Sequence, residues 1–294
     1  MSKFAVIDIG SNSIRYGEEK DGSFPSKEVY TTRLGSGLAQ TGRLSDKSVK
    51  KSLAVIRILS DRARAGGFVP VGYATSAVRD AENGQAFRKK VEAECLVPVE
   101  VLSESDEAKL AFIGANRSGS FDAMIDIGGA SMQIVTRDIA VSFRAGCVRL
   151  TDIAREKTSA VSPDDRPEEQ RRAVEEYLDG ILVLPDLTVG KLVGVGGTIT
   201  TLAALETGLD VFDPASVERV EITPASLESM IARLLSLGEK RRENPFLAAR
   251  HDVILCGAYI LARALKKLNA DSVSVSCSDG LEGYLAKVKR YGIR

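Results

Sequence analysis

Short apolar runs and helically spaced apolar positions alternate along this chain, which predicts an α/β protein. Short β-rich runs bounded by small or polar residues are typical of strands, and apolar residues at every third or fourth position are typical of helices. Strands are predicted at residues 4–9, 13–16, 27–32, 69–73, 99–102, 124–127, 133–135, 141–143, 191–195 and 272–277. Helices are predicted at residues 45–65, 84–94, 171–182, 226–237, 253–268 and about 280–294, and further helices start near residues 103 and 198.

One strand-and-turn pattern occurs twice. Residues 7–13 are Ile-Asp-Ile-Gly-Ser-Asn-Ser, and residues 125–131 are Ile-Asp-Ile-Gly-Gly-Ala-Ser. A turn of small residues can expose several backbone N–H groups to an anionic oxygen. The preceding acids, Asp8 and Asp126, are of the type that holds Mg²⁺ together with water and phosphate oxygens. For one copy an ordinary hairpin turn is the better interpretation, but the repetition favours two related domains that face one cleft.

Length and charge limit the classes of function. The chain of 294 residues is long enough for two domains, and the polar stretch 116–120 predicts a boundary between residues 1–119 and 120–294. Its 40 basic and 40 acidic residues balance, so no general basic field favours nucleic acid. The chain runs directly into a strand, and no apolar run approaches the length of a membrane span. We therefore expect a cytoplasmic protein with neither nucleic acid nor membrane as a partner.

The cysteines and the single histidine exclude two kinds of chemistry. Cys95, Cys147, Cys256 and Cys277 are scattered without any Cys-x-x-Cys pair, so we expect small buried apolar residues rather than disulfides or zinc ligands. With His251 as the only histidine, a zinc centre or a histidine-based triad has too few residues. Any chemistry of this protein is therefore expected to use carboxylates, hydroxyls, backbone amides and Mg²⁺.

Two arginines and one glycine turn are candidates for binding an anion. Arg79 follows a strand that ends in small hydroxylated residues, and Arg149 lies in a predicted glycine bend at 145–151. Arginine binds phosphate through two parallel hydrogen bonds, although ordinary surface arginines explain both positions equally well. The glycines within residues 194–197 precede a helix, where free amides form an anion site. Their spacing is not that of the dinucleotide-binding fingerprint.

Acidic residues open the helix that starts near residue 103. Ser103 and Asp106 have the spacing of a capping box, and acids are favourable at the positive end of a helix. Helix capping explains the presence of Asp106 well, but it does not specifically require an acid at Glu107.

Together these motifs resemble the duplicated fold of actin, hexokinase and Hsp70, and within it the exopolyphosphatase/guanosine pentaphosphate phosphatase (Ppx/GppA) family. The resemblance covers nearly the whole chain. It rests on six blocks, of which the first two in order are specific to the family: residues 8–15, 74–81, 126–131, 146–151, 196–198 and 280–281. It implies two actin-like (ribonuclease H-like) α/β domains around an interdomain cleft, with the terminal helix at about 280–294 packed back on the first domain.

The resemblance also implies a site. Glu107 would be the general base that activates a water, and Arg79 would neutralise phosphate oxygens during transfer to that water. Asp8, Asp126 and Gln133 would hold Mg²⁺. The phosphate-binding residues would be Gly10, Ser11, Asn12, Ser13, Arg15, Gly128, Gly129, Ala130, Ser131, Gly197 and Thr198. The substrate would be inorganic polyphosphate or guanosine pentaphosphate.

The chain departs from the family pattern near these residues. Ala130 replaces a glycine, Gln133 a glutamate and Glu104 a glycine, and the arginine expected before Glu282 is absent. Each change removes or opposes affinity for a cation or for phosphate. These departures leave open a polyphosphate- or nucleotide-binding sensor with little turnover. The glycine turns alone are equally compatible with an ATP-dependent kinase of the same superfamily, which is a less favoured alternative.

Two further expectations concern size and assembly. Long members of the family carry additional helical domains that this chain lacks, so we expect a preference for short polyphosphate or a small phosphorylated substrate. The leucine-rich helix at 253–268 fits a core helix better than a contact in a homodimer, which remains the alternative.

Overall fold

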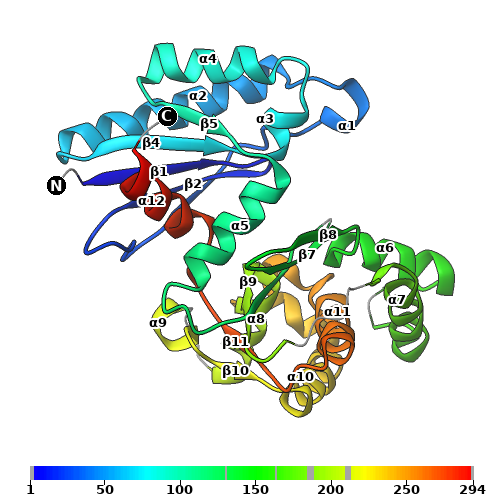
Figure 1. Cartoon of the computed structure of the whole chain (residues 1–294). Helices are drawn as coiled ribbons and strands as arrows, with labels where there is room; N and C mark the ends of the chain where they lie inside the picture. The colour runs from blue at the N-terminus through cyan, green and yellow to red at the C-terminus, as the bar shows by residue number, and fades with distance from the viewer. Residues whose placement is uncertain (1–2, 130, 163, 184–188, 209–212, 293–294) are drawn as a thin grey trace. The chain divides into compact units, whose positions relative to one another are not determined.

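The computed structural model describes residues 3–129, 131–162, 164–183, 189–208 and 213–292 (Figure 1). Contacts divide the chain into two compact units. The first comprises Met1–Gly114 and Asp279–Arg294, and the second Ala115–Ser278. The predicted boundary after residue 119 lies a few residues beyond this division, and the terminal helix is grouped with the first unit.

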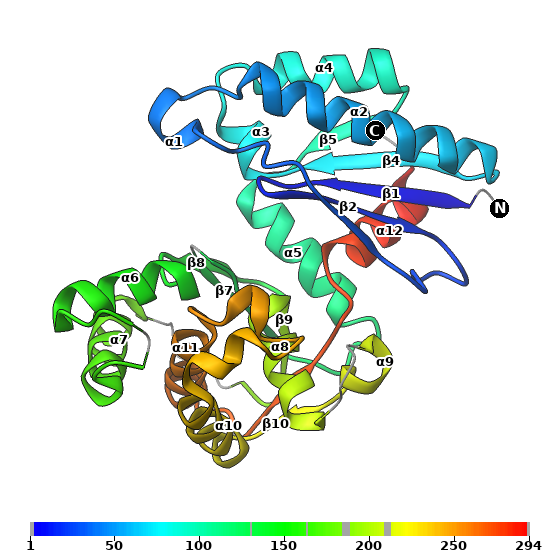
Figure 2. The same ribbon diagram turned by 180° about the vertical axis from the view of Figure 1, so that it is seen from behind.

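The first unit is a five-stranded sheet with helices on both faces (Figures 1 and 2). The strand order is β3-β2-β1-β4-β5, in which β1 pairs antiparallel with β2 and parallel with β4. The strands are β1 (Phe4–Ile9), β2 (Ser13–Glu18), β3 (Glu28–Thr31), β4 (Val69–Ala74) and β5 (Val99–Val101). The helices are α1 (Leu38–Thr41), α2 (Asp46–Ala65), α3 (Ser76–Asp80), α4 (Gly84–Cys95), α5 (Glu104–Ala115) and α12 (Gly280–Tyr291).

Alternation along β1 assigns its side chains to two different cores. Ile7 and Ile9 belong to the apolar cluster that includes residues of α2, α3 and α4. Val6 belongs to a second cluster, which contains Leu110 of α5 and Leu281 of α12. Because successive side chains of a strand point to opposite faces, Asp8 shares the face of Val6. The sequence pattern thereby directs Asp8 toward α5 and α12.

The second unit contains a six-stranded sheet with the order β10-β11-β9-β6-β7-β8. Its strands are β6 (Ala123–Ile127), β7 (Met132–Thr136), β8 (Ala140–Phe143), β9 (Leu192–Val195), β10 (Glu221–Ile222) and β11 (Val273–Val275). Its helices are α6 (Cys147–Thr158), α7 (Pro167–Ile181), α8 (Gly196–Thr207), α9 (Pro214–Val217), α10 (Pro224–Leu237), α11 (Ile254–Leu268) and the 3₁₀ segments η1 (Gly238–Arg242) and η2 (Ala248–Arg250). One large apolar cluster joins its sheet to its helices.

The two units repeat one topology. Reading β8-β7-β6-β9-β11 in place of β3-β2-β1-β4-β5 gives the same order, and β10 is an addition at the edge. The register repeats as well, because Asp8 lies opposite Arg15 and Asp126 lies opposite Gln133. The prediction of a duplicated α/β fold is confirmed.

The predicted glycine bend at 145–151 is wrong beyond Gly146, because α6 begins at Cys147. The N–H groups of Cys147, Val148 and Arg149 donate to the carbonyls of Gly128 and Gly129, at 2.9, 2.9 and 3.1 Å. Helix N-termini need such acceptors. Here a distant turn supplies them, which a local sequence pattern does not reveal.

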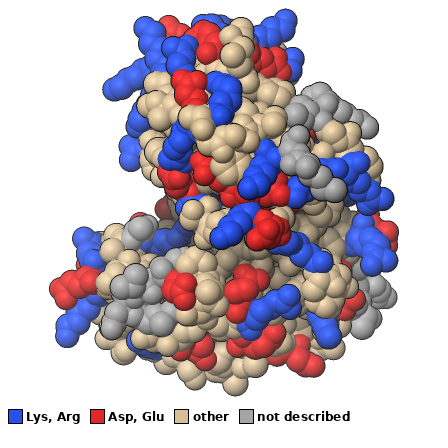
Figure 3. Space-filling model, turned by 90° about the vertical axis from the view of Figure 1, so that its left-hand side faces the viewer, with Lys and Arg blue, Asp and Glu red and all other residues tan. Residues whose placement is uncertain are grey.

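Three other expectations can be compared with the structure. Cys95, Cys147 and Cys256 are buried, whereas Cys277 is partly exposed. Within the described ranges no helix combines the length and apolar character needed to cross a membrane. Basic and acidic side chains are interspersed on the face that Figure 3 shows, in keeping with the balanced composition.

Glycines allow α12 to approach α5 closely. A Cβ at Gly283 would overlap the backbone carbonyl of Leu110, and one at Gly114 would overlap that of Asp279.

We expect Gly283→Ala to lower the free energy of unfolding by ~1–3 kcal/mol through overpacking. Denaturant unfolding followed by circular dichroism measures it. The control is Gly180→Ala in α7, where a Cβ would meet open space. This variant should raise the free energy of unfolding by ~1 kcal/mol, because alanine favours the helix more than glycine does. If both variants raised it, the close packing of α12 on α5 would be contradicted.

Candidate active site

Asp8 and Arg15 form the centre of the site in the first unit. Both come from the hairpin of β1 and β2, where they lie opposite each other. Arg15 Nε donates to Asp8 Oδ2 at 2.7 Å, and Arg15 Nη2 lies 2.6 Å from the same oxygen. The side chain of Asp8 is only 8% exposed. Its Oδ1 is buried and has no hydrogen-bond partner among the described residues.

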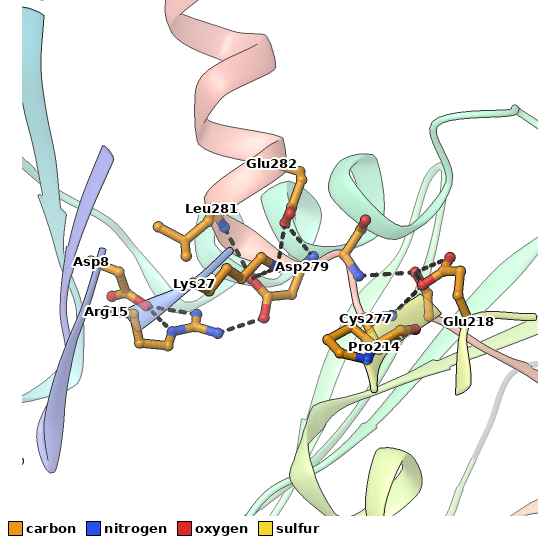
Figure 4. A network of polar contacts seen from close by, with 11 residues as sticks. Asp8, Arg15, Lys27, Pro214, Glu218, Cys277, Asp279, Leu281 and Glu282 are labelled. Carbon is orange, nitrogen blue, oxygen red and sulfur yellow. Dashed lines mark hydrogen bonds and ion pairs between the residues drawn. The ribbon is translucent and has the colours of Figure 1, made fainter. Parts of the chain in front are cut away.

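The start of α12 supplies a second acid to Arg15 (Figure 4). Arg15 Nη1 donates to Asp279 Oδ2 at 2.5 Å. Asp279 also accepts the N–H of Leu281 at 3.1 Å, and Glu282 Oε2 accepts the N–H of Asp279 at 2.8 Å, which completes a capping box. Lys27 Nζ lies 2.8 Å from Glu282 Oε2. Glu282 is therefore engaged inside the first unit.

Burial and ion pairing act against each other in this network. Burial raises the pKa of Asp8, and the charge of Arg15 only partly offsets it. For Asp279 burial also acts to raise the pKa, but Arg15 and Lys27 outweigh it and the pKa is lowered. The pKa of Glu282 is raised, mainly by burial and against the effect of Lys27. Arg15 is thus the cation that both neighbouring carboxylates require.

Glu107 and Arg79, the two predicted catalytic residues, lie together. Arg79 is in the short helix α3, which the sequence did not predict, and Glu107 is in the first turn of α5. Arg79 Nη1 donates to Glu107 Oε2 at 3.4 Å and to the carbonyl of Leu102 at 3.1 Å. Arg79 Nε donates to Asp80 at 3.2 Å.

Burial and three neighbouring charges determine the direction in which the pKa of Glu107 is shifted. Its pKa is raised by burial and by the charge of Asp8, while Arg79 and Arg15 lower it. Asp8 affects this pKa because it lies on the sheet face that is directed toward α5, the helix that carries Glu107. The capping alternative applies to its neighbour, because Ser103 Oγ accepts the N–H of Asp106 at 3.0 Å. Capping therefore explains Asp106 and leaves Glu107 available.

The turn after Asp8 is fixed by its own backbone. The N–H of Gly10 donates to the carbonyl of Ser13 at 3.1 Å, so the predicted use of the Gly10 amide for phosphate is not supported. Ser11 Oγ lies 2.8 Å from Ser76 Oγ, which joins the turn to α3. The carbonyl of Asn12 accepts two N–H groups, from Thr32 at 3.1 Å and from Arg33 at 2.8 Å. The hydroxyls and the other amides of this turn stay predicted contacts for phosphate.

The turn after Asp126 has the same closure. The N–H of Gly128 donates to the carbonyl of Ser131 at 2.9 Å, so this amide is also occupied. The carbonyls of Gly128 and Gly129 accept the first amides of α6. Arg149, the second anion candidate, lies in that first turn of α6. Ala130 lies outside the described residues.

Gly196 and Gly197 bring two opposite charges near the start of α8. Gly196 has φ of 85°, and a Cβ there would overlap Asp126 Oδ1. A Cβ at Gly197 would overlap the guanidinium of Arg250. Only glycine allows these approaches. The side chain of the next residue, Thr198, is buried against Gly257 of α11, so its hydroxyl is not exposed to a ligand.

The acids fit a divalent cation only together with other ligands. Asp8 offers the unpartnered buried Oδ1, and Gln133 lies on the same face as Asp126 because cross-strand neighbours share a face. In the described part of the chain no three His, Cys, Asp or Glu residues form a metal-binding group. Mg²⁺ typically uses one or two carboxylates and completes its shell with water and phosphate oxygens. Taken by itself, Asp8 in the first unit or Asp126 in the second can contribute one carboxylate to such a shell.

Sequence reasoning missed the contacts of four residues of the site. Asp279 and Glu282 have the spacing of a capping box, a signal that would have placed them at a helix start but not beside Arg15. Lys27 and Arg250 carry no local signal, because their positions depend on contacts distant in the chain.

Comparisons with known proteins agree with the resemblance seen in the sequence. A model of the Ppx/GppA phosphatase family matches residues 18–288. Exopolyphosphatase 2 of Mycobacterium tuberculosis is 32% identical over 321 residues, which cover 96% of this chain and 97% of that protein. The crystal structure of the Ppx/GppA phosphatase of Aquifex aeolicus has a TM-score of 0.86 at 28% identity, and the match covers 98% of this chain and 99% of that one.

We expect Arg15→Met to lower the free energy of unfolding by ~3 kcal/mol, because Asp8 and Asp279 lose their shared cation in a largely buried setting. Denaturant unfolding measures the change. Arg43→Met is the control: its pair with Glu82 is 58% and 66% exposed, so we expect a loss below ~1 kcal/mol. Equal losses for the two variants would show that the network does not stabilise the first unit.

Proposed function

The chain belongs to the Ppx/GppA phosphatase family and is a phosphoanhydride hydrolase, and we propose that it releases the terminal phosphate of inorganic polyphosphate or guanosine pentaphosphate. Polyphosphate is favoured by the similarity to exopolyphosphatase 2 over nearly the full length of both chains. One observation carries the mechanism: Glu107, whose pKa is raised by burial and by Asp8, lies within hydrogen-bonding reach of Arg79.

In this proposal Glu107 is the general base. Its carboxylate takes a proton from a water as the water oxygen bonds to the terminal phosphorus and the bridging P–O bond breaks. A carboxylate with a raised pKa is a stronger base near neutral pH than an ordinary glutamate. Arg79 stabilises the negative charge on the transferred group, since electrostatic stabilisation supplies most of the catalysis of phosphoryl transfer.

Asp8, Asp126 and Gln133 are the proposed ligands of Mg²⁺, which would neutralise phosphate oxygens when bound. The unpartnered Oδ1 of Asp8 supports this assignment, because Arg15 bonds only to Oδ2. The hydroxyls and remaining amides of the two turns are the proposed phosphate contacts. A cytoplasmic location and a homodimer stay predictions.

A binding protein with little turnover is the second candidate. Its sequence argument included Glu282, but this carboxylate is satisfied by Lys27 and by the N–H of Asp279. Gln133 remains in its favour, because it places an amide where an acid would hold a cation more strongly. The observation that Glu107 and Arg79 lie together favours hydrolysis.

Replacing the base separates these candidates. With Mg²⁺ and polyphosphate, we expect Glu107→Gln to lower kcat at least ~100-fold, because general base catalysis contributes about that factor or more. Phosphate release measures it. Glu104→Gln is the matched control on the same helix: Glu104 is exposed and should leave kcat nearly unchanged. If the unaltered protein and Glu107→Gln both bind polyphosphate without releasing phosphate, the binding function replaces the hydrolase.

The pH dependence tests the electrostatics of Glu107. A base must be ionised, so kcat/KM should fall as the pH drops through the pKa of Glu107, at a higher pH than for an ordinary glutamate. Arg79 lowers that pKa. We therefore expect Arg79→Gln to move the acid limb to still higher pH, in addition to slowing the reaction.

A pH–rate profile at saturating Mg²⁺ measures this shift. Arg57→Gln is the control, because its partner is the exposed Glu94 and it should leave the limb in place. An acid limb unmoved by Arg79→Gln would assign the titration to another group.

A further inference from the structure

A cavity of about 250 Å³ in the second unit has no role in the proposed hydrolysis. It lies between α6, residues 161–162, η1 and the turn that precedes α11. Three arginines line it: Arg155 from α6, and Arg241 and Arg242 from η1. Such a concentration of guanidinium groups around one hollow is suited to an oxyanion, because arginine presents a planar fork of donors.

Two of these guanidinium groups have donors without acceptors. Arg241 is only 2% exposed. Its Nη2 donates to both carboxylate oxygens of Asp164 at 2.7 Å, and its Nε donates to the carbonyl of Gly238 at 3.0 Å. Its Nη1 is buried without a hydrogen-bond partner among the described residues, as is Nε of Arg155. Nearly all buried donors in proteins are satisfied, so two unpaired ones on residues that line one cavity need an acceptor that the described residues do not supply.

The acids near the cavity do not neutralise Arg155. Asp164 pairs with Arg241, and Glu239 lies 2.8 Å from Arg242. Asp252 also lines the cavity, but it is exposed, where water and salt weaken its field. Arg155 forms no ion pair within the described ranges. A charged donor group and the spare donors of Arg241 therefore remain for a ligand.

The cavity is connected through the chain to the turn after Asp126, which belongs to the same unit. α6 starts at the carbonyls of Gly128 and Gly129 and reaches Arg155 ~12 Å further along its axis, at 1.5 Å per residue. On the other wall, His251 directly follows Arg250, whose guanidinium lies against Gly197. A chain of phosphates that contacts the Asp126 turn and follows α6 would come to Arg155 after ~12 Å.

We propose that this cavity is a second phosphate site, which binds either a phosphate of the substrate chain beyond the one cleaved or the phosphate that the reaction releases. The inference of an anion rests on the arginines alone, and the choice of phosphate rests on the proposed function. Water molecules filling the same space are the competing explanation, since a polar cavity of this size can hold several.

Direct binding is tested without turnover. Crystals of the full chain are soaked in selenate, whose anomalous signal marks oxyanion sites, and solution binding of inorganic phosphate is measured by calorimetry. We expect an anomalous peak beside Arg155 and Arg241. In Arg155→Gln the peak should disappear, and phosphate affinity for that site should fall about tenfold, as for the loss of one charged hydrogen bond.

Lys157→Gln is the matched control, because Lys157 is an exposed cation on the same helix. It should leave peak and affinity unchanged. Arg241→Lys is the second variant. Its result is interpreted separately, because the buried Arg241 also bonds to Asp164 and Gly238 and its replacement can affect folding. An empty cavity, or a peak and phosphate affinity unaffected by both arginine variants, would overturn the proposal.

Kinetics distinguish the two sources of phosphate. If the cavity holds the substrate chain, Arg155→Gln raises KM about tenfold for long polyphosphate and leaves kcat and the KM for tripolyphosphate unchanged. If it holds released phosphate, the variant weakens product inhibition and leaves both KM values unchanged. No change in any of these quantities contradicts a role in the reaction. If the unaltered protein releases no phosphate, the proposed function fails, while the selenate and calorimetry results still decide whether the site exists.

Discussion

The ion pair between Asp8 and Arg15 is the constraint on which the site in the first unit depends. Asp8 lies on a buried sheet face, where a carboxylate is costly unless a cation accompanies it. Arg15 meets this need from the neighbouring strand, and Asp279 in turn balances Arg15. Because Asp279 caps α12, the last helix must pack closely against the sheet. Gly114 and Gly283 allow α12, in that position, to lie close to α5.

Duplication preserved the geometry but not the charges. In both units an acid is the second-to-last residue of the central strand and a glycine amide closes the following turn. The residue opposite the acid is Arg15 in one unit and Gln133 in the other. In the second unit a guanidinium comes instead from Arg250, which lies against the glycine next to the one that contacts Asp126. Each acid therefore has an arginine in its neighbourhood, supplied by different parts of the fold.

Local patterns predicted the elements well, and the contacts of charged side chains poorly. The repeated Asp turns, the helix cap at Ser45 and the buried strands are encoded within a few residues, so the sequence reveals them. The assignment of Glu107 and Arg79 to one site followed from the family resemblance rather than from spacing, and their contact was not predicted. The start of α6 and the partners of Arg15 depend on tertiary contacts, which single-sequence periodicity does not contain.

The balance of charges around Glu107 gives Arg79 a second role in the proposed mechanism. Burial and Asp8 both raise the pKa of Glu107, and a bound polyanion would raise it further, since like charges disfavour ionisation. A base driven too far in this direction would hold its proton near neutral pH and could not accept another from water. Arg79 opposes the rise through its contact with the Glu107 carboxylate. In the proposed mechanism one guanidinium therefore both stabilises charge on the transferred phosphate and keeps Glu107 ionised before transfer begins.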